Sequence, residues 1–102
     1  MYTHGEAVAI GMGMAADLGC ILEATPARAE LVRRQDALCA AVGLPTRLAG
    51  IEPAAVLEAM GGDKKYVGGQ NRLIVPAAIG TAEIVTDVPD APIIAAVAGR
   101  CD

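Results

Sequence analysis

The sequence predicts a small, mainly α-helical domain that carries one short β-hairpin. Helical caps and apolar spacing mark residues 3–22, 25–42 and 53–61 as helices. Residues 72–85 are instead rich in β-branched side chains and contain a glycine where a hairpin would turn. With 102 residues, the chain forms one domain at most. The expected order is therefore helix, helix, short helix, hairpin and a last helix.

The first predicted helix begins at a capping box and continues as an apolar segment. Thr3 suits the N-cap, and Glu6 stands at the third helical position, where it can bond back to the cap. The body is apolar nearly all round, which indicates a buried helix. Gly11 and Gly13 each cost a helix up to about 1 kcal/mol relative to alanine, so we expect a packing reason for them. A smooth stripe, against which another backbone could pack, recurs at every fourth position: Ala7, Gly11 and Ala15.

The second helix is predicted from Thr25, as N-cap before a proline, to Val42, with Gly43 as its stop. Glu30 can pair with Arg34, four residues later. Its apolar side is expected to consist of Leu31, Leu38, Ala41 and Val42. Its solvated face is expected to consist of Arg28, Glu30, Arg33, Arg34 and Asp36.

The remaining chain predicts a third helix from Pro53, a hairpin and a last helix. The polar loop "GGDKKYVGGQN" follows the third helix. The segments "RLIV" and "AEIV" read as two strands with Gly80 near the turn, and Pro76 confines the first strand to an edge or a short length. The last helix runs from Pro89 or Asp90 to Ala98.

Composition narrows the class of protein. The net charge is −4 and the aromatic residues are two tyrosines, so we expect no nucleic-acid partner. Three widely spaced cysteines, without a CxxC pattern, predict reduced cytosolic thiols: Cys20, Cys39 and Cys101. The longest apolar run ends at Asp17, short of the ~20 residues of a membrane span. We therefore expect a cytoplasmic protein without a membrane partner, whose small side chains leave an apolar face to be covered.

His4 is the only histidine, and its position allows two interpretations. From position alone, a histidine that only packs or bonds locally is favoured by roughly three to one. The helix cannot complete a zinc site, which needs three protein ligands, because Asp17 and Cys20 lie about 20 and 24 Å from His4 along the axis. Glu6 points to a different face. Any further ligands must come from elsewhere.

The segment "HGEAVAIGM", which starts at His4, resembles the opening of the C-terminal half of the 3-dehydroquinate synthases. Further matches follow in the family's order: "GLPT", "LEAMGGDKK", "RLIVPAAIGTAEIV" and "DVPDAPI". The resemblance covers essentially the whole chain. It extends more weakly to other sugar-phosphate cyclases, such as 2-deoxy-scyllo-inosose synthase. It implies that residues 1–102 form the C-terminal helical domain on the metal and substrate side of such an enzyme.

The family's activity implies roles for three residues. These enzymes convert 3-deoxy-arabino-heptulosonate 7-phosphate to 3-dehydroquinate and phosphate in the shikimate pathway, with NAD and a divalent metal, usually zinc. The histidine of the HGEAV motif is a metal ligand in the family, which carries over to His4. A lysine of the DKK loop contacts substrate, which carries over to Lys64 or Lys65, and the choice stays open. Glu6 keeps its place in the capping box.

The chain also departs from the family. The glycines of "GMGMAADLG" lie inside a helix, so they do not form a dinucleotide-binding loop, and no cofactor-binding residue is expected. The family's other metal ligands, a glutamate and a second histidine, have no counterpart before Tyr2. We expect a cloned fragment or a natural truncation that is inactive alone and lacks its N-terminal nucleotide-binding domain as partner. The alternative is a helical module without chemistry that self-associates through exposed apolar surface.

Overall fold

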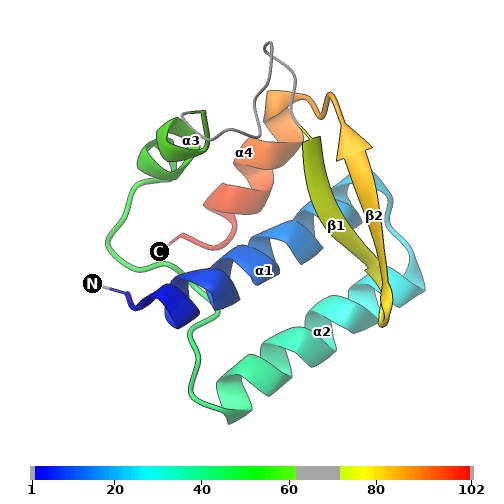
Figure 1. Ribbon diagram of the computed structural model, residues 1–102, viewed down its shortest axis with the longest axis horizontal. Helices are drawn as coiled ribbons and strands as arrows, with labels where there is room; N and C mark the ends of the chain where they lie inside the picture. Colours follow the sequence, from blue (N-terminus) through cyan, green and yellow to red (C-terminus); the bar gives the residue numbers. More distant parts are fainter. Residues whose placement is uncertain (1, 62–71, 102) are drawn as a thin grey trace.

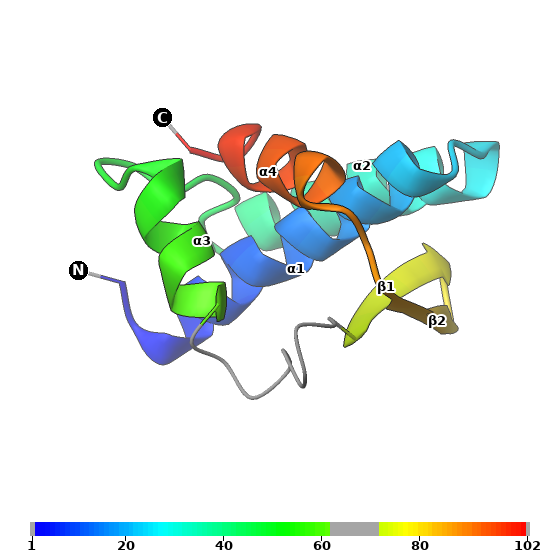
Figure 2. The same cartoon turned by 90° about the horizontal axis from the view of Figure 1, so that it is seen from above.

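The computed structural model describes residues 2–61 and 72–101 and contains helices together with a two-stranded antiparallel sheet. The elements are α1 (His4–Leu22), α2 (Pro26–Ala41), α3 (Pro53–Gly61), β1 (Arg72–Ala78), β2 (Thr81–Thr86) and α4 (Asp90–Ala98). The central element is α1, which contacts α2, α4 and β1 (Figure 1). Seen from above, α1, α2 and α4 lie together, and the hairpin lies on one side of them (Figure 2). The predicted fold class is confirmed.

Local sequence signals set most of the element boundaries. The capping box of α1 forms as predicted: the Glu6 amide donates to Thr3 Oγ1 at 3.2 Å, and the Thr3 amide donates to Glu6 Oε1 at 2.8 Å. The Arg28 amide donates to Thr25 Oγ1 at 3.1 Å and caps α2. Beyond α2, Gly43 adopts a φ of +82°, a conformation that suits glycine after a helix end.

The hairpin matches its prediction, although β1 is longer than expected. Ile74 pairs with Ile84, and Gly80 in the turn has a φ of +84°. The strand continues through Pro76, with a register shift between Pro76 and Ala78. Proline is tolerated here because each strand of a two-stranded sheet is an edge strand.

The core is built from aliphatic side chains of modest size. Val75 of β1 is 1% exposed and is the most deeply buried large side chain of the described residues. Residues of α1, β1 and α4, with one from the loop before α4, form the cluster: Leu18, Val75, Val88, Ile93, Ala96 and Val97. By length and composition alone α1 could cross a membrane. In this fold it instead packs against α2, β1 and α4.

The prediction for the two sides of α2 is wrong in part, although Glu30, Arg33 and Arg34 are exposed as expected. Leu38 and Val42 are 65% and 63% exposed, whereas Arg28 is only 5% exposed. Arg28 is buried because its guanidinium reaches the hairpin, where it donates to Glu83 Oε1 at 2.5 Å and to the Pro76 carbonyl at 3.2 Å. The inner side of α2 is therefore partly ionic, and its last turns lie away from the hairpin (Figure 1).

Two further expectations about the charged residues of α2 are corrected. Glu30 pairs with Arg33, three residues later, instead of Arg34. Asp36 does not belong to a solvated face, because it accepts a hydrogen bond from Arg100 at 2.9 Å. The folded chain places Arg33 beside Glu30 and Arg100 beside Asp36, and helical spacing alone does not select these partners.

Candidate functional site

His4 is the first residue of α1, and its side chain is exposed. A histidine binds a metal in its neutral form. The exposed ring of His4 is therefore accessible to a ligand from outside the described residues.

Glu6 is engaged in the capping box, as predicted. Hydrogen bonds from the backbone and side chain of Thr3 lower the pKa of its carboxyl. The carboxylate that these bonds stabilise is held at the helix cap by the Thr3 amide at 2.8 Å. Glu6 therefore stabilises the first turn of α1, which begins at His4.

A complete metal site is not present within residues 2–61 and 72–101, where no group of three His, Cys, Asp or Glu side chains could hold an ion. Asp17, farther along α1, is committed to Arg100, with contacts of 2.6 and 2.9 Å. A zinc site that included His4 would need its other ligands from outside the described part of the chain.

The predicted substrate residues Lys64 and Lys65 lie outside the described residues. The flanking elements are described: α3 ends at Gly61 and β1 begins at Arg72. The assignment of Lys64 or Lys65 to substrate binding stays a prediction from the family resemblance.

A buried arginine that sequence reasoning missed fastens the C-terminal end to both long helices. Arg100 is 5% exposed, and besides Asp17 its guanidinium bonds Asp36 and the Thr46 carbonyl, the latter at 3.1 Å. The hydrogen bonds and charges of the two aspartates raise the pKa of Arg100 above its usual range. The available signal was Asp17 itself, since an acidic residue in a buried helix needs a partner.

Of Gly11 and Gly13, only Gly13 has the expected packing reason. A Cβ at Gly13 would lie 2.7 Å from Arg100 Nη1, so the guanidinium can pass only because no side chain is there. At Gly11 no atom would lie within 4 Å of a Cβ, so the prediction for Gly11 is wrong within the described part of the molecule. Gly19, which was not singled out, meets Arg28 and the Pro76 carbonyl in the same way, each at 3.1 Å.

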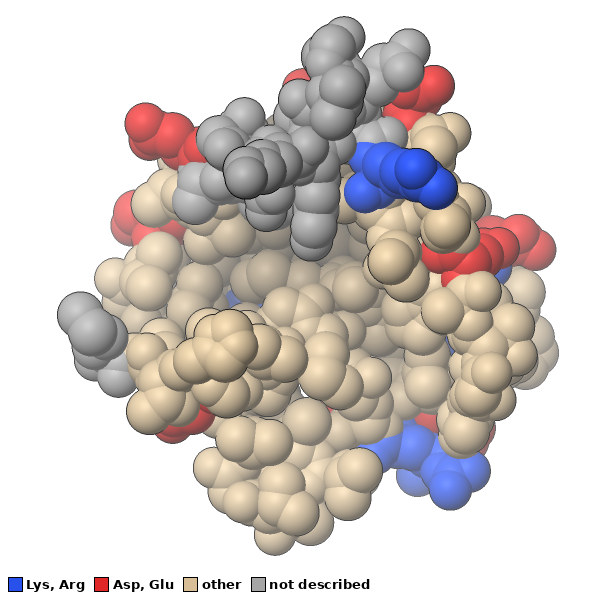
Figure 3. Space-filling model, in the orientation of Figure 1, with Lys and Arg blue, Asp and Glu red and all other residues tan. Residues whose placement is uncertain are grey.

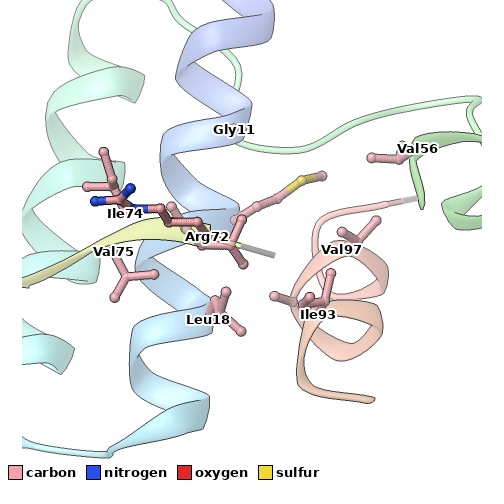
Figure 4. Close-up of a pocket in the computed structure, with 12 residues that line it drawn as sticks. Gly11, Leu18, Val56, Arg72, Ile74, Val75, Ile93 and Val97 are labelled. Carbon is pink, nitrogen blue, oxygen red and sulfur yellow. The ribbon is translucent and has the colours of Figure 1, made fainter. Parts of the chain in front are cut away.

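An apolar pocket of about 370 Å³ lies between α1, α3, β1 and α4 (Figure 4). Gly11 and Ala15 of the predicted smooth stripe line it, together with Val56, Ile93 and Val97. In the space-filling view, uncharged residues fill the middle of this side and charged residues lie toward its edges (Figure 3). The pocket does not include His4. Arg72 is the charged residue that lines it, and the other lining residues are uncharged.

The N-terminal end of α1 is tied to a distant loop by a contact that sequence reasoning also missed. The Ala49 amide donates to the Tyr2 hydroxyl at 2.9 Å, across 47 residues of sequence. Tyr2 stands two residues before His4 and is half-buried. No sequence pattern indicates this contact, because it joins two segments that only the fold brings together.

Comparison with known proteins identifies what the chain is similar to. Residues 1–66 match the family model described as 3-dehydroquinate synthase C-terminal. The chain is 44% identical over 91 residues to the 3-dehydroquinate synthase of Xylella fastidiosa (strain 9a5c), which covers 88% of the chain and 23% of that protein. It is 44% identical over 97 residues to the enzyme of Acidithiobacillus ferrooxidans (strain ATCC 53993 / BNL-5-31), which covers 90% of the chain and 25% of that protein.

A third relative gives the same result. The 3-dehydroquinate synthase of Synechococcus sp. (strain ATCC 27144 / PCC 6301 / SAUG 1402/1) is 45% identical over 87 residues, which covers 84% of the chain and 23% of that protein. The chain thus spans about a quarter of the length of the curated relatives it matches. These matches agree with the motif that begins at His4 and with the mainly helical fold built on α1. The chain belongs to the 3-dehydroquinate synthase C-terminal family.

Proposed function

We propose that this chain supplies part of the active site of an enzyme that converts 3-deoxy-arabino-heptulosonate 7-phosphate to 3-dehydroquinate and phosphate, within the shikimate pathway. The observation that carries the proposal is the exposed His4 at the first position of α1, inside the segment most typical of the family. The identities of 44–45% to 3-dehydroquinate synthases support the same reaction. The proposed location is the cytoplasm.

His4 is proposed as one of three ligands of a divalent metal, zinc in the usual case. When bound, zinc would polarise a hydroxyl or carbonyl oxygen of the substrate. The imidazole of His4 binds a metal in its neutral form, and its exposed position at the start of α1 leaves it accessible. A glutamate and a second histidine from an upstream N-terminal domain would complete the ligand set. That domain would also bind NAD.

Lys64 or Lys65 is proposed to bind the substrate. The substrate carries a carboxylate and a phosphate, and an ammonium group forms charge-assisted hydrogen bonds with either. Both lysines stand in a sequence segment rich in glycine. Replacing each lysine by methionine in separate variants would identify the one that raises the KM for substrate.

The exposed face of α1 is proposed to contact the upstream domain. Val8 and Met12 follow His4 at intervals of four residues, which puts all three on one side of the helix. Val8 and Met12 are each 46% exposed, although the helix is otherwise the centre of the fold. An apolar stripe that starts at the proposed metal ligand suits a domain that brings the other two ligands.

Phosphate release from the heptulosonate phosphate, with NAD and zinc present, tests the proposal. The chain is assayed alone and then mixed with the separately made upstream part of a 3-dehydroquinate synthase. We expect activity only in the mixture, and we expect His4→Ala to abolish it. Thr81→Ala, at the exposed hairpin turn, is the control and should leave activity unchanged. Activity of the chain alone, or full activity of the His4→Ala mixture, would contradict the proposal.

A second candidate function is a helical module without chemistry that self-associates. Large exposed side chains on α2 and β1 favour it: Leu38, Val42 and Ile74 are 63–68% exposed. Sedimentation over a range of concentrations would detect the association, and Leu38→Glu should weaken it. If an active mixture instead converted a different sugar phosphate and not the heptulosonate phosphate, the chain would belong to another sugar-phosphate cyclase, such as 2-deoxy-scyllo-inosose synthase.

A further inference from the structure

The first turn of α1 needs support if His4 is to meet other ligands in a defined geometry. The first turn of a helix frays readily. A working metal ligand must be held within about 0.5 Å of its required position. The capping box of Thr3 and Glu6 closes the turn, yet it does not attach the turn to the rest of the molecule.

The residue before an N-cap often provides that attachment by packing on the fourth helical residue. Here the residue before the cap is Tyr2, and the fourth helical residue is Ala7, which is small and exposed. Tyr2 instead accepts a hydrogen bond from the Ala49 amide at 2.9 Å. The chain entering α1 is therefore fastened to the loop between α2 and α3.

That loop is itself fixed by the C-terminal segment. The Leu48 amide donates to the Arg100 carbonyl at 2.6 Å, and Leu48 forms a parallel bridge with Cys101. The Arg100 guanidinium also holds the Thr46 carbonyl at 3.1 Å, while it is clasped by Asp17 and Asp36. Both chain ends lie on the same side of the molecule (Figures 1 and 2). Tyr2 is thus joined to a firmly bonded part of the fold.

We propose that Tyr2 is a positioning residue for His4, acting through residues 46–49 and Arg100. The hydroxyl of Tyr2 holds the start of α1 at a set place relative to the middle of the same helix, which Asp17 joins to Arg100. The ring of His4 is then presented to its partner ligands without a search over frayed conformations. This inference rests on the proposed role of His4.

Amide hydrogen exchange of the 102-residue chain tests the attachment directly. Tyr2→Phe removes one hydroxyl and keeps the ring, and Thr81→Val, which removes a hydroxyl from the exposed start of β2, is the control. We expect amide exchange to quicken about fivefold at two positions: Ala49, and Ala7, whose amide donates to the Thr3 carbonyl. A roughly fivefold change is the factor that corresponds to the loss of one hydrogen bond. Unchanged exchange at both amides in Tyr2→Phe would overturn the inference.

Zinc affinity separates positioning from a purely structural role. It is measured by chelator competition on the chain mixed with the upstream part of a 3-dehydroquinate synthase. We expect Tyr2→Phe to raise the zinc Kd at least threefold while the melting temperature of the chain stays within a few degrees. An unchanged Kd in Tyr2→Phe, when His4→Ala does weaken zinc binding, overturns the inference and leaves the proposed function standing. An unchanged Kd in His4→Ala overturns the proposed function and the inference with it.

Discussion

Replacing Arg100 by methionine should lower the free energy of unfolding of this domain more than any substitution at the surface. Methionine keeps most of the length of the side chain but removes the guanidinium that joins the chain end to α1 and α2. The substitution breaks contacts with Asp17 at 2.6 and 2.9 Å, with Asp36 at 2.9 Å and with the Thr46 carbonyl at 3.1 Å. It also leaves two aspartates without their buried partner.

The size of the effect follows from how exposed those aspartates are. Removing one member of a buried ion pair costs about 3–5 kcal/mol when the remaining charge stays buried. The side chains of Asp17 and Asp36 are 27% and 36% exposed, so water can partly hydrate them after the change. We therefore expect the lower end of the range, about 3 kcal/mol. That is a large share of the ~5–15 kcal/mol typical of a whole domain.

Urea unfolding followed by circular dichroism measures this loss. With a slope of about 1.5 kcal/mol per molar urea, the midpoint of Arg100→Met should fall by about 2 M. Arg33→Met is the matched control, because Arg33 is a 69% exposed arginine in a surface pair with Glu30. The control should leave the urea midpoint nearly unchanged, because an exposed ion pair contributes little to stability. Equal, small losses in both variants would refute the reasoning that the Arg100 cluster secures the fold.

Three other predictions concern single side chains in α1. Gly13→Ala should destabilise the chain by about 2 kcal/mol, because its Cβ would lie 2.7 Å from Arg100 Nη1. Gly11→Ala should stabilise the chain by up to about 1 kcal/mol, because no atom lies within 4 Å of its Cβ. Equal stabilities of the two variants in the same urea assay would contradict this. Because the pKa of Glu6 is lowered in the folded chain, its carboxylate contributes fully to stability above the ordinary carboxyl pKa, and this contribution is lost as pH falls through the lowered value. Glu6→Gln should therefore make the free energy of unfolding depend less on pH below about 4.5. Parallel pH curves for the two proteins would contradict this. Burial and, to a smaller extent, the charge of Asp17 raise the pKa of the Cys20 thiol. At pH 8 iodoacetamide should therefore alkylate Cys20 more slowly in the folded than in the urea-unfolded chain, as measured by mass spectrometry of the Cys20 peptide. Equal rates would contradict this.

The local structure was largely predictable because its causes lie close together in sequence. Thr3 with Glu6, and Thr25 before a proline, are short-range signals whose hydrogen bonds span three residues, and both caps form. Gly80 turns the hairpin because its φ of +84° is open to glycine without strain. The motif that begins at His4 is also a short continuous segment, so the residues alone indicate the family, and the family match over residues 1–66 agrees.

The long-range contacts were not predictable. Helical spacing made Leu38 and Val42 the inner side of α2, yet the fold exposes both, and it buries Arg28 because Glu83 and the Pro76 carbonyl satisfy its charge there. A buried charge is tolerable only beside its partner, and which partner arrives depends on packing between distant segments.

The sequence by itself thus determined the elements, their caps, the family and the candidate ligand His4. Only the tertiary structure decided that Arg100 joins α1 to α2 and that Tyr2 attaches the start of α1 to the loop at Ala49. The physical reason is range: caps and turns are settled within a few residues, whereas these bonds join positions 47 to 83 residues apart and form only when the core brings them together.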